Sequence, residues 1–188
     1  MKIVFLDIDG VLNVYPQGYD DFGAIFHQHF MDNLKRIIDE TGAKIVISSS
    51  WRHDGLERMQ EMWKHRKLSG EVIDVTPGLH LMKGGCIQFY NGKLKRHPTE
   101  RVHGYSVPRG CEIDYWLRNE AQRFGVVENF CVIDDDVDFL LQHQKHFVKC
   151  SGNTDHPDAI DLGLGLTDKC TDKAIEILNT VKLTYDNY

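Results

Sequence analysis

The chain has 188 residues, of which 41% are hydrophobic and 27% are charged, and this predicts a single globular domain over residues 1–188. The net charge of −6 gives no general reason to expect nucleic-acid binding, and five scattered cysteines without a Cys-x-x-Cys pair argue against a disulfide framework or a zinc site. No stretch approaches the roughly 20 apolar residues of a membrane span, and Asp7 interrupts the apolar start too early for a signal peptide. We therefore expect a soluble, cytoplasmic protein with no membrane contact and no obligate protein partner.

Apolar stretches alternate with helical patterns along the chain, which indicates a parallel sheet with crossover helices. We expect strands at 2–7, 44–47, 72–75, 130–133 and 146–150. We expect helices at about 30–41, 55–67, 109–124 and 168–181, with Thr167 as the N-cap of the last and an irregular passage over 13–29. The predicted fold class is a three-layer, Rossmann-like α/β fold.

Two carboxylates, Asp7 and Asp9, stand at the end of the first apolar strand and are followed by Gly10. Because residues i and i+2 of an extended segment project to the same side, these carboxylates are expected side by side at the edge of the sheet. A cation or a shared proton relieves their mutual repulsion. An acidic turn at a strand end is the simpler alternative, but later segments supply matching parts.

Polar residues also follow two other predicted strands. Ser48, Ser49 and Arg52 come after the second strand, and Asp134 and Asp135 come after the fourth. In an open parallel sheet, ligands collect beyond the carboxyl ends of the strands. Hydroxyls and backbone amides there donate to phosphate oxygens, and carboxylates are the ligands that Mg²⁺ prefers.

The segment around Asp7 and Asp9 resembles motif I of the haloacid dehalogenase (HAD) superfamily, a hydrophobic strand followed by Asp-x-Asp-Gly-x-Leu. The resemblance implies that Asp7 is the nucleophile, which forms an aspartyl-phosphate, and that Asp9 is the general acid and base. It also implies that the Asp7 carboxylate and the Asp9 backbone carbonyl bind Mg²⁺. The second Asp is usual in the phosphatases of this superfamily and is missing from the dehalogenases.

Two further motifs of the superfamily have counterparts. The serine run resembles motif II, where a Ser or Thr binds the phosphoryl group, with Ser49 preferred to Ser48. The acidic run resembles motif IV, which completes the magnesium site, with Asp134 preferred to Asp135. Arg52 is either a bidentate phosphate donor or a solvated residue at a helix start, and the sequence leaves both open.

The chain departs from the superfamily at motif III, where a Lys usually offsets charge between nucleophile and phosphate. No Lys stands ahead of the helix that leads to the acidic strand, and Arg109 is the candidate there. Lys83 is a competing candidate. An Arg neutralises carboxylates too, but its geometry and hydration differ from those of Lys.

A basic insert at about 76–107 separates motif II from motif III. From Lys83 to Arg109 there are six cations and one acid, a charge of +5, against −11 for the rest of the chain. Within the insert, 85–97 is predicted to be a β-hairpin with its turn at Asn91-Gly92. We expect a basic flap over the site, or alternatively a solvated hairpin that protects an edge strand.

The Ser-Ser-Ser-Trp-Arg, Arg-Gly-x-Glu, Ile-Asp-Asp-Asp and Gly-Leu-Thr segments together resemble a bacterial subgroup whose phosphatase-like domains are associated with RNA-repair proteins. We therefore expect an Mg²⁺-dependent phosphatase that acts on a phosphorylated small molecule or a phosphorylated nucleic-acid end. The alternative is a non-catalytic phosphate- or nucleic-acid-binding domain on the same fold. We do not expect a receiver-type signalling domain, because the roughly fifty residues after Asp136 are too few for the four further βα units that it requires. The ten histidines show no spacing typical of a transition-metal site.

Overall fold

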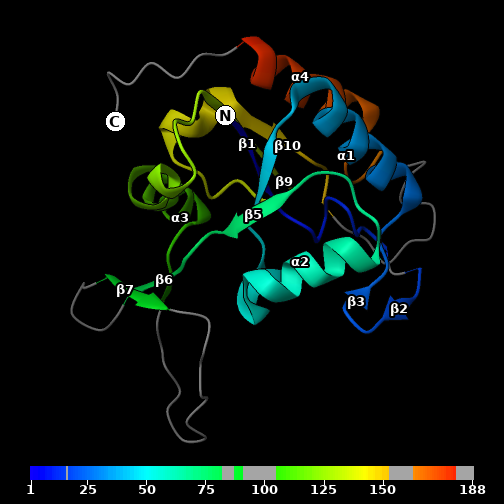
Figure 1. The fold of residues 1–188 in the computed structure, drawn as a ribbon, viewed down its shortest axis with the longest axis horizontal. Coiled ribbons are helices and arrows are strands. Elements are labelled where there is room, and N and C mark those ends of the chain that lie inside the picture. The colour runs from blue at the N-terminus through cyan, green and yellow to red at the C-terminus, as the bar shows by residue number, and fades with distance from the viewer. Residues whose placement is uncertain (16, 82–86, 91–104, 153–162, 181–188) are drawn as a thin grey trace, which may run out of the picture.

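The computed structural model describes residues 1–15, 17–81, 87–90, 105–152 and 163–180. Its centre is a five-stranded, wholly parallel sheet in the order β10-β9-β1-β4-β5 (Figure 1). The strands are β1 (Lys2–Leu6), β4 (Lys44–Ile47), β5 (Val72–Val75), β9 (Asn129–Asp134) and β10 (Phe147–Lys149). The parallel sheet predicted from the alternating pattern is therefore confirmed, and each predicted strand is present within two residues of its expected bounds.

Within the described residues, four α-helices connect the strands or follow them: α1 (Gln28–Thr41), α2 (Leu56–His65), α3 (Arg109–Tyr115) and α4 (Asp168–Thr180). The predicted N-cap of α4 is confirmed, because the amide of Cys170 donates to the hydroxyl of Thr167 at 3.3 Å. Beyond α3, the helical run predicted to reach residue 124 continues as a π-helical turn, Trp116–Glu120, and a 3₁₀ turn, Ala121–Arg123. Two other 3₁₀ turns are Ser50–Asp54 and Leu141–His146.

Helices cover both faces of the sheet, which gives the predicted three layers. Successive residues of β1 point to opposite faces. Val4 and Leu6 belong to a core that also contains buried side chains of α1, α2 and α4. Ile3 and Phe5 belong to a second core that contains Ile113 of α3 and the residues after it. In Figure 1, α1 and α4 lie side by side, and α3 lies apart from them.

In the part of the chain that the structure describes, two small antiparallel sheets accompany the central one. The passage 13–29, expected to be irregular, contains a short hairpin of β2 (Tyr19–Asp20) and β3 (Gly23–Ala24). In the insert, β6 (Gly78–Leu81) pairs with both β7 (Ile87–Tyr90) and β8 (Tyr105–Ser106).

The predicted hairpin of the insert is found in part. The strand Ile87–Tyr90 is present, and the partner that the structure gives it is β6 rather than the segment after the Asn91-Gly92 turn. That turn, the return strand predicted at 93–95 and Lys83 all lie outside the described residues. The expected basic flap therefore stays a prediction.

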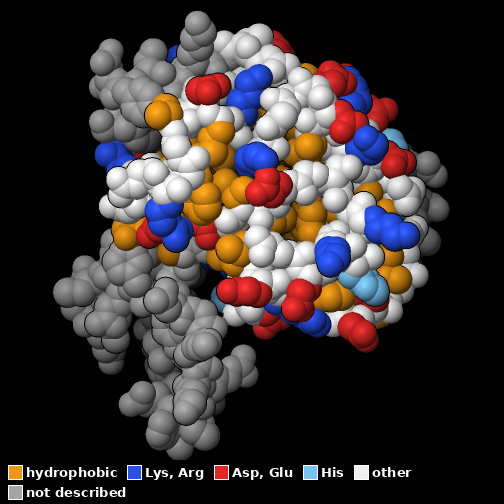
Figure 2. Space-filling view, viewed as in Figure 1, with side chains coloured by type: hydrophobic (Ala, Val, Ile, Leu, Met, Phe, Trp, Pro, Cys, Tyr) orange, Lys and Arg blue, Asp and Glu red, His pale blue; other side chains and the backbone are white. Residues whose placement is uncertain are grey.

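The described surface carries charges of both signs. In the face that Figure 2 shows, Lys and Arg side chains are interspersed with Asp and Glu side chains and form no single-sign patch. Among the described residues, no helix combines the length and the apolar character that crossing a membrane requires.

Candidate active site

The carboxyl ends of three adjacent strands bring the predicted motifs together. Leu6 of β1 is in register with Ile47 of β4 and with Ile133 of β9. One residue further, the amide of Asp7 donates to the carbonyl of Ile133 at 3.0 Å, and the amide of Ser48 donates to the carbonyl of Leu6 at 2.8 Å. The end of β1 therefore lies between the end of β4 and the end of β9, as the rule for parallel sheets predicts.

A tight turn follows Asp7 and depends on Gly10. The amides of Leu12 and Asn13 both donate to the carbonyl of Ile8, at 2.8 and 3.1 Å, so the chain reverses at once. Gly10 has a φ of +74°, and a Cβ on it would lie 2.2 Å from a carboxylate oxygen of Asp135. Only glycine fits this approach, which explains its place after the second Asp.

Three carboxylates form a cluster at this edge of the sheet. Asp7, Asp134 and Asp135 each offer an oxygen, and these oxygens lie within 4.8 Å of one another. Burial and the charge of Asp7 raise the pKa of Asp134 to about 7. Burial and Asp7 also raise the pKa of Asp135. Such repulsion is what a divalent cation relieves, and an all-oxygen donor set fits Mg²⁺.

Arg109, at the start of α3, lies against two members of this cluster. Its Nη1 is 3.0 Å from Oδ1 of Asp7 and 2.9 Å from Oδ2 of Asp134, and it donates to the carbonyl of Ser48 at 2.5 Å. Burial alone would lower the pKa of Arg109. The negative charges of Asp7 and Asp134 outweigh this effect, so the pKa of Arg109 is above its ordinary value. Each carboxylate oxygen has two lone pairs, so an oxygen that accepts from Arg109 still has one for a metal ion.

The acidic loop after β9 positions Arg109 as well. The carboxylate of Asp138 accepts a hydrogen bond of 2.8 Å from the backbone amide of Arg109, and the carbonyl of Asp138 accepts one from the amide of Gly110 at 3.2 Å. Asp138 thus binds the first turn of α3. The Arg109 side chain is 21% exposed and Asp135 is partly exposed, whereas Asp7 and Asp134 are buried.

The two candidate serines differ in what their hydroxyls contact. The hydroxyl of Ser49 is hydrogen-bonded to Asp7, and it accepts from the amide of Trp51 at 3.4 Å. The hydroxyl of Ser48 is buried and has no hydrogen-bond partner among the described residues. The structure therefore brings Ser49 to Asp7, and the phosphate-binding role of either serine stays a prediction.

Burial dominates the electrostatics of Asp7 itself. The side chain is almost fully buried, and burial raises its pKa above the usual range. Arg109, the Ser49 hydroxyl and the amide of Ile8 act in the opposite direction and stabilise the carboxylate. A carboxylate with few water contacts and one cationic neighbour suits a nucleophile.

Arg52 is neither solvated nor free in this structure. Its guanidinium donates to Oε2 of Glu112 at 2.6 Å and to the carbonyl of Ser49 at 2.7 Å. Both side chains of the Arg52–Glu112 pair are nearly buried, with exposed fractions of 11% and 6%. The alternative of a solvated residue at a helix start is therefore wrong, because the α3 carboxylate covers the guanidinium. The phosphate-donor role of Arg52 stays a prediction, and this pair ties α3 to the loop that carries Ser49.

The Asp9 carboxylate is held away from the cluster by two donors. Nε1 of Trp51 donates to Oδ2 of Asp9 at 2.8 Å, and Nδ2 of Asn13 donates to Oδ1 at 3.0 Å. Among the described residues, the metal-compatible group does not contain the Asp9 side chain. The resemblance assigned the metal to the Asp9 backbone carbonyl and the proton transfer to its carboxylate, and this arrangement is compatible with both roles.

The structure thus brings together Asp7, Ser49, Arg109, Asp134 and Asp135, with Asp9 beside them and Lys83 outside the described residues. Sequence reasoning missed three polar neighbours of the site, which are Asn13, Trp51 and Glu112. Asn13 is four residues after Asp9, within the turn that Gly10 indicates in the sequence. Trp51 and Glu112 fall inside the segments that carry the family resemblance, and that was the available signal.

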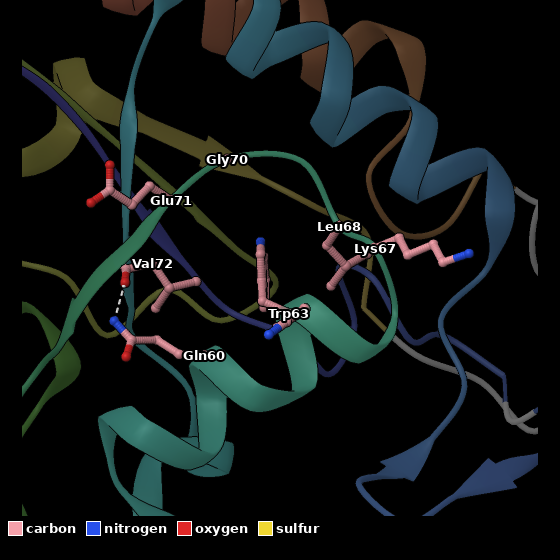
Figure 3. Close-up of a pocket in the computed structure, with 8 residues that line it drawn as sticks. Gln60, Trp63, Lys67, Leu68, Gly70, Glu71 and Val72 are labelled. Carbon is pink, nitrogen blue, oxygen red and sulfur yellow. Dashed lines mark hydrogen bonds between the residues drawn. The ribbon is translucent and has the colours of Figure 1, made fainter.

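A separate surface pocket lies at the other end of the sheet (Figure 3). It has a volume of about 360 Å³ and is bordered by the end of α2 and the residues that lead into β5, including Trp63 and Gly70. Gln60 borders it and donates to the carbonyl of Val72 at 2.8 Å. Because Val72 is the first residue of β5, this pocket is at the amino end of the strands and is not part of the carboxylate cluster.

Comparison with known proteins agrees with the geometry. A family model described as "HAD domain in Swiss Army Knife RNA repair proteins" matches residues 3–155, which include every site residue named above. No curated protein and no solved structure matches the chain. Because the family model covers most of the sequence, the chain belongs to the HAD superfamily, as one of the HAD domains of Swiss Army Knife RNA repair proteins.

Proposed function

We propose that the protein is an Mg²⁺-dependent phosphatase that hydrolyses a phosphate monoester through an aspartyl-phosphate on Asp7. The observation that carries this proposal is the arrangement around Asp7, whose buried carboxylate contacts the Arg109 guanidinium at 3.0 Å and the Ser49 hydroxyl. A cation and a hydroxyl beside a buried carboxylate are the groups that a phosphoryl transfer to that carboxylate requires.

In the first step, an oxygen of Asp7 attacks phosphorus and the bond from phosphorus to the leaving oxygen breaks. Asp9 donates a proton to that oxygen. In the second step, Asp9 takes a proton from a water molecule that attacks phosphorus, and the bond to Asp7 breaks. The Trp51 and Asn13 hydrogen bonds orient the Asp9 carboxylate for both transfers.

The carboxylates of Asp7, Asp134 and Asp135 form a donor set that fits a magnesium ion. From the family resemblance, we propose the backbone carbonyl of Asp9 as a further ligand. Such an ion, when bound, neutralises charge on the phosphoryl oxygens. Arg109 supplies a second positive charge, and its contact with the Ser48 carbonyl fixes it relative to the serine loop. The Ser49 hydroxyl then donates to a phosphoryl oxygen.

The substrate that we propose is a phosphorylated nucleic-acid end. The family description names RNA repair proteins, and the segment 83–109 has a sequence charge of +5 in a chain of net charge −6. Cations concentrate extended anions and make their binding salt-dependent. The same chemistry at Asp7 also accommodates a small phosphate monoester, so the two substrate classes are compared in one experiment.

The test measures phosphate release from 3′- and 5′-phosphorylated oligonucleotides and from an aryl phosphate, with magnesium and with excess chelator. The proposal expects release that requires magnesium and that Asp7→Asn abolishes. Binding of the oligonucleotides without any release from either substrate class would support the alternative, a non-catalytic phosphate- or nucleic-acid-binding domain.

Replacing Lys93, Lys95 and Arg96 together by Ala tests the role of the basic insert at 76–107. A flap that contacts an extended anion predicts a selective loss of oligonucleotide hydrolysis and a flatter salt dependence. Equal effects on hydrolysis of the oligonucleotide and of the aryl phosphate, or no effect on either, would support the alternative, a solvated hairpin that protects an edge strand.

A further inference from the structure

Two cysteines meet where the end of β10 packs against the first turn of α4. Cys150 directly follows β10 and is buried, and Cys170 is the third residue of α4 and half-buried. The Cys150 thiol lies close enough to the Cys170 sulfur for the two groups to shift each other's pKa. The Cys170 sulfur also lies 3.6 Å from the carbonyl of Lys149, next to Cys150 in the chain. Both are free thiols, so the pair is reduced in this structure.

The surroundings of Cys170 stabilise a negative charge on its sulfur. The Thr167 hydroxyl donates to this sulfur at 3.3 Å, and Lys173 stands one turn further along the helix. Position in the first turn of a 13-residue helix adds the favourable end of the helix dipole. Although burial opposes it, the Cys150 thiol and the hydrogen bonds from Thr167 lower the pKa of Cys170 to about 6.

The other described cysteines have the opposite environment. Cys111 is also partly exposed, but burial and its acidic neighbours, Asp114 first among them, raise its pKa. Cys131 is fully buried in the core, and burial raises its pKa as well. Reactivity toward oxidants follows thiolate character together with access, and a nearby second thiol resolves the first oxidation product. Only the Cys150–Cys170 pair meets these conditions among the described residues.

We propose that Cys170 and Cys150 form a reversible oxidation site, in which a hydroperoxide converts the two thiols into a disulfide. The Cys170 thiolate attacks one oxygen of hydrogen peroxide and the O–O bond breaks. A sulfenic acid forms on Cys170, and the hydroxide that leaves takes up a proton to become water. The Cys150 sulfur then attacks the Cys170 sulfur, the S–O bond breaks, and a second water leaves. With hydrogen peroxide, one oxidant is reduced to two waters, and the two thiols supply two electrons and two protons.

This disulfide joins two segments that are otherwise linked by packing and hydrogen bonds. The amide of Cys150 donates to the backbone carbonyl of Asp134 at 2.8 Å, so one anchor of the bridge is adjacent to the carboxylate cluster. The oxidation chemistry itself does not depend on the proposed phosphatase activity.

The experiment treats the full reduced chain with hydrogen peroxide and maps every cysteine by peptide mass spectrometry, before and after reduction with a dithiol. The expected product is a Cys150–Cys170 disulfide, lighter by two hydrogens, that the dithiol reverses. In Cys150→Ser the sulfenic acid on Cys170 persists, and dimedone traps it there about tenfold faster than at Cys111. Cys111 serves as the matched, partly exposed control.

Two outcomes would overturn the proposal. One is the absence of a Cys150–Cys170 bridge in the oxidised parent chain. The other is dimedone labelling of Cys111 as fast as that of Cys170 in Cys150→Ser. Circular dichroism of Cys150→Ser and Cys170→Ser, compared with the parent, shows whether each variant is folded. Cys170→Ser is expected to lose both the bridge and the labelling at this site while Cys111 labelling is unchanged.

Discussion

The guanidinium of Arg109 lies 3.0 Å from the carboxylate of Asp7, and the same nitrogen contacts Asp134 at 2.9 Å. One cation thus bridges the proposed nucleophile and a proposed metal ligand. A Lys ammonium is a compact point charge, whereas the planar guanidinium presents several donors in a fixed geometry. Arg109 is therefore placed to act where the superfamily has its motif III Lys, with an additional bond to the serine loop, and this role stays a prediction.

Replacing Arg109 by Ala is expected to lower kcat/KM for phosphate monoesters by about 10²–10³-fold, because it removes a preorganised cation from the reacting centre. Arg109→Lys keeps the charge but loses the bridging geometry, and it should recover only part of this loss. Steady-state kinetics on an aryl phosphate measures both. Arg123→Lys, an exposed position after α3, is the matched control, and an Arg109→Ala variant with parental kcat/KM would contradict the role.

Loss of the Trp51 indole hydrogen bond is expected to disturb proton transfer by Asp9. Trp51→Phe keeps an aromatic ring beside Phe26 but removes the 2.8 Å bond to the carboxylate. We expect a decrease in kcat of about tenfold with poor leaving groups and less with good ones, since only poor leaving groups need the proton. Asp9→Asn should lower kcat by about 10²–10⁴-fold.

The control for this experiment is Trp63→Phe, whose indole donates to Ser69 at 3.1 Å at the far end of the sheet. It should leave the dependence on leaving group unchanged. Equal slowing of good and poor leaving groups by Trp51→Phe would show that the indole has no part in positioning Asp9.

Removing the Asp134 carboxylate is expected to weaken magnesium binding. Asp134→Ala should raise the magnesium concentration for half-maximal activity by about tenfold or more, with a smaller change in KM for the phosphate substrate. Asp136→Ala is the control, because Asp136 is exposed and its backbone amide, which bonds to Asp134 at 2.8 Å, remains. The same magnesium titration curve in the parent and in Asp134→Ala would move the ligand assignment to Asp135.

The buried His143 is expected to make the folded state sensitive to acid. Burial lowers the pKa of His143 to about 4, whereas the unfolded chain binds a proton near pH 6.5. The stability from neutral His143 is complete above about pH 6.5 and is lost as pH falls toward 4. Urea unfolding should show that the free energy of unfolding falls by on the order of 2 kcal/mol between about pH 6.5 and pH 4. In His143→Leu, the free energy of unfolding should depend less on pH over this range. Parallel pH profiles for parent and variant would refute this.

The strand ends that carry the site could be predicted because the sequence patterns that indicate them are local. Asp7 and Asp134 each follow an apolar run directly, and a parallel sheet aligns the carboxyl ends of its strands. Thr167 as an N-cap and the strand Lys44–Ile47 were likewise readable from neighbouring residues. In each case the deciding interaction is within the element or between adjacent strand ends.

The rest depends on contacts between residues far apart in the sequence. Trp51 and Asp9 are 42 positions apart, and Arg52 and Glu112 are 60 apart, so the packing of α3 and the serine loop decides these bonds. The pairing of β7 with β6 has a different cause, because it joins segments close in the sequence, and either edge of Ile87–Tyr90 can accept a partner strand. A side-chain period predicts which face is buried and does not predict which polar atom meets another.

The proposed aspartyl-phosphate on Asp7 can be tested by trapping the phosphoryl group on the protein. Asp9→Asn, mixed with a substrate labelled in its phosphate and quenched in acid within one turnover, should retain the label covalently. Peptide mapping should then find it on Asp7. Attack by Asp7 on phosphorus predicts labelled Asp7 in this variant and no labelled peptide after Asp7→Asn. Label on another residue, or hydrolysis by Asp7→Asn at the parental rate, would contradict it.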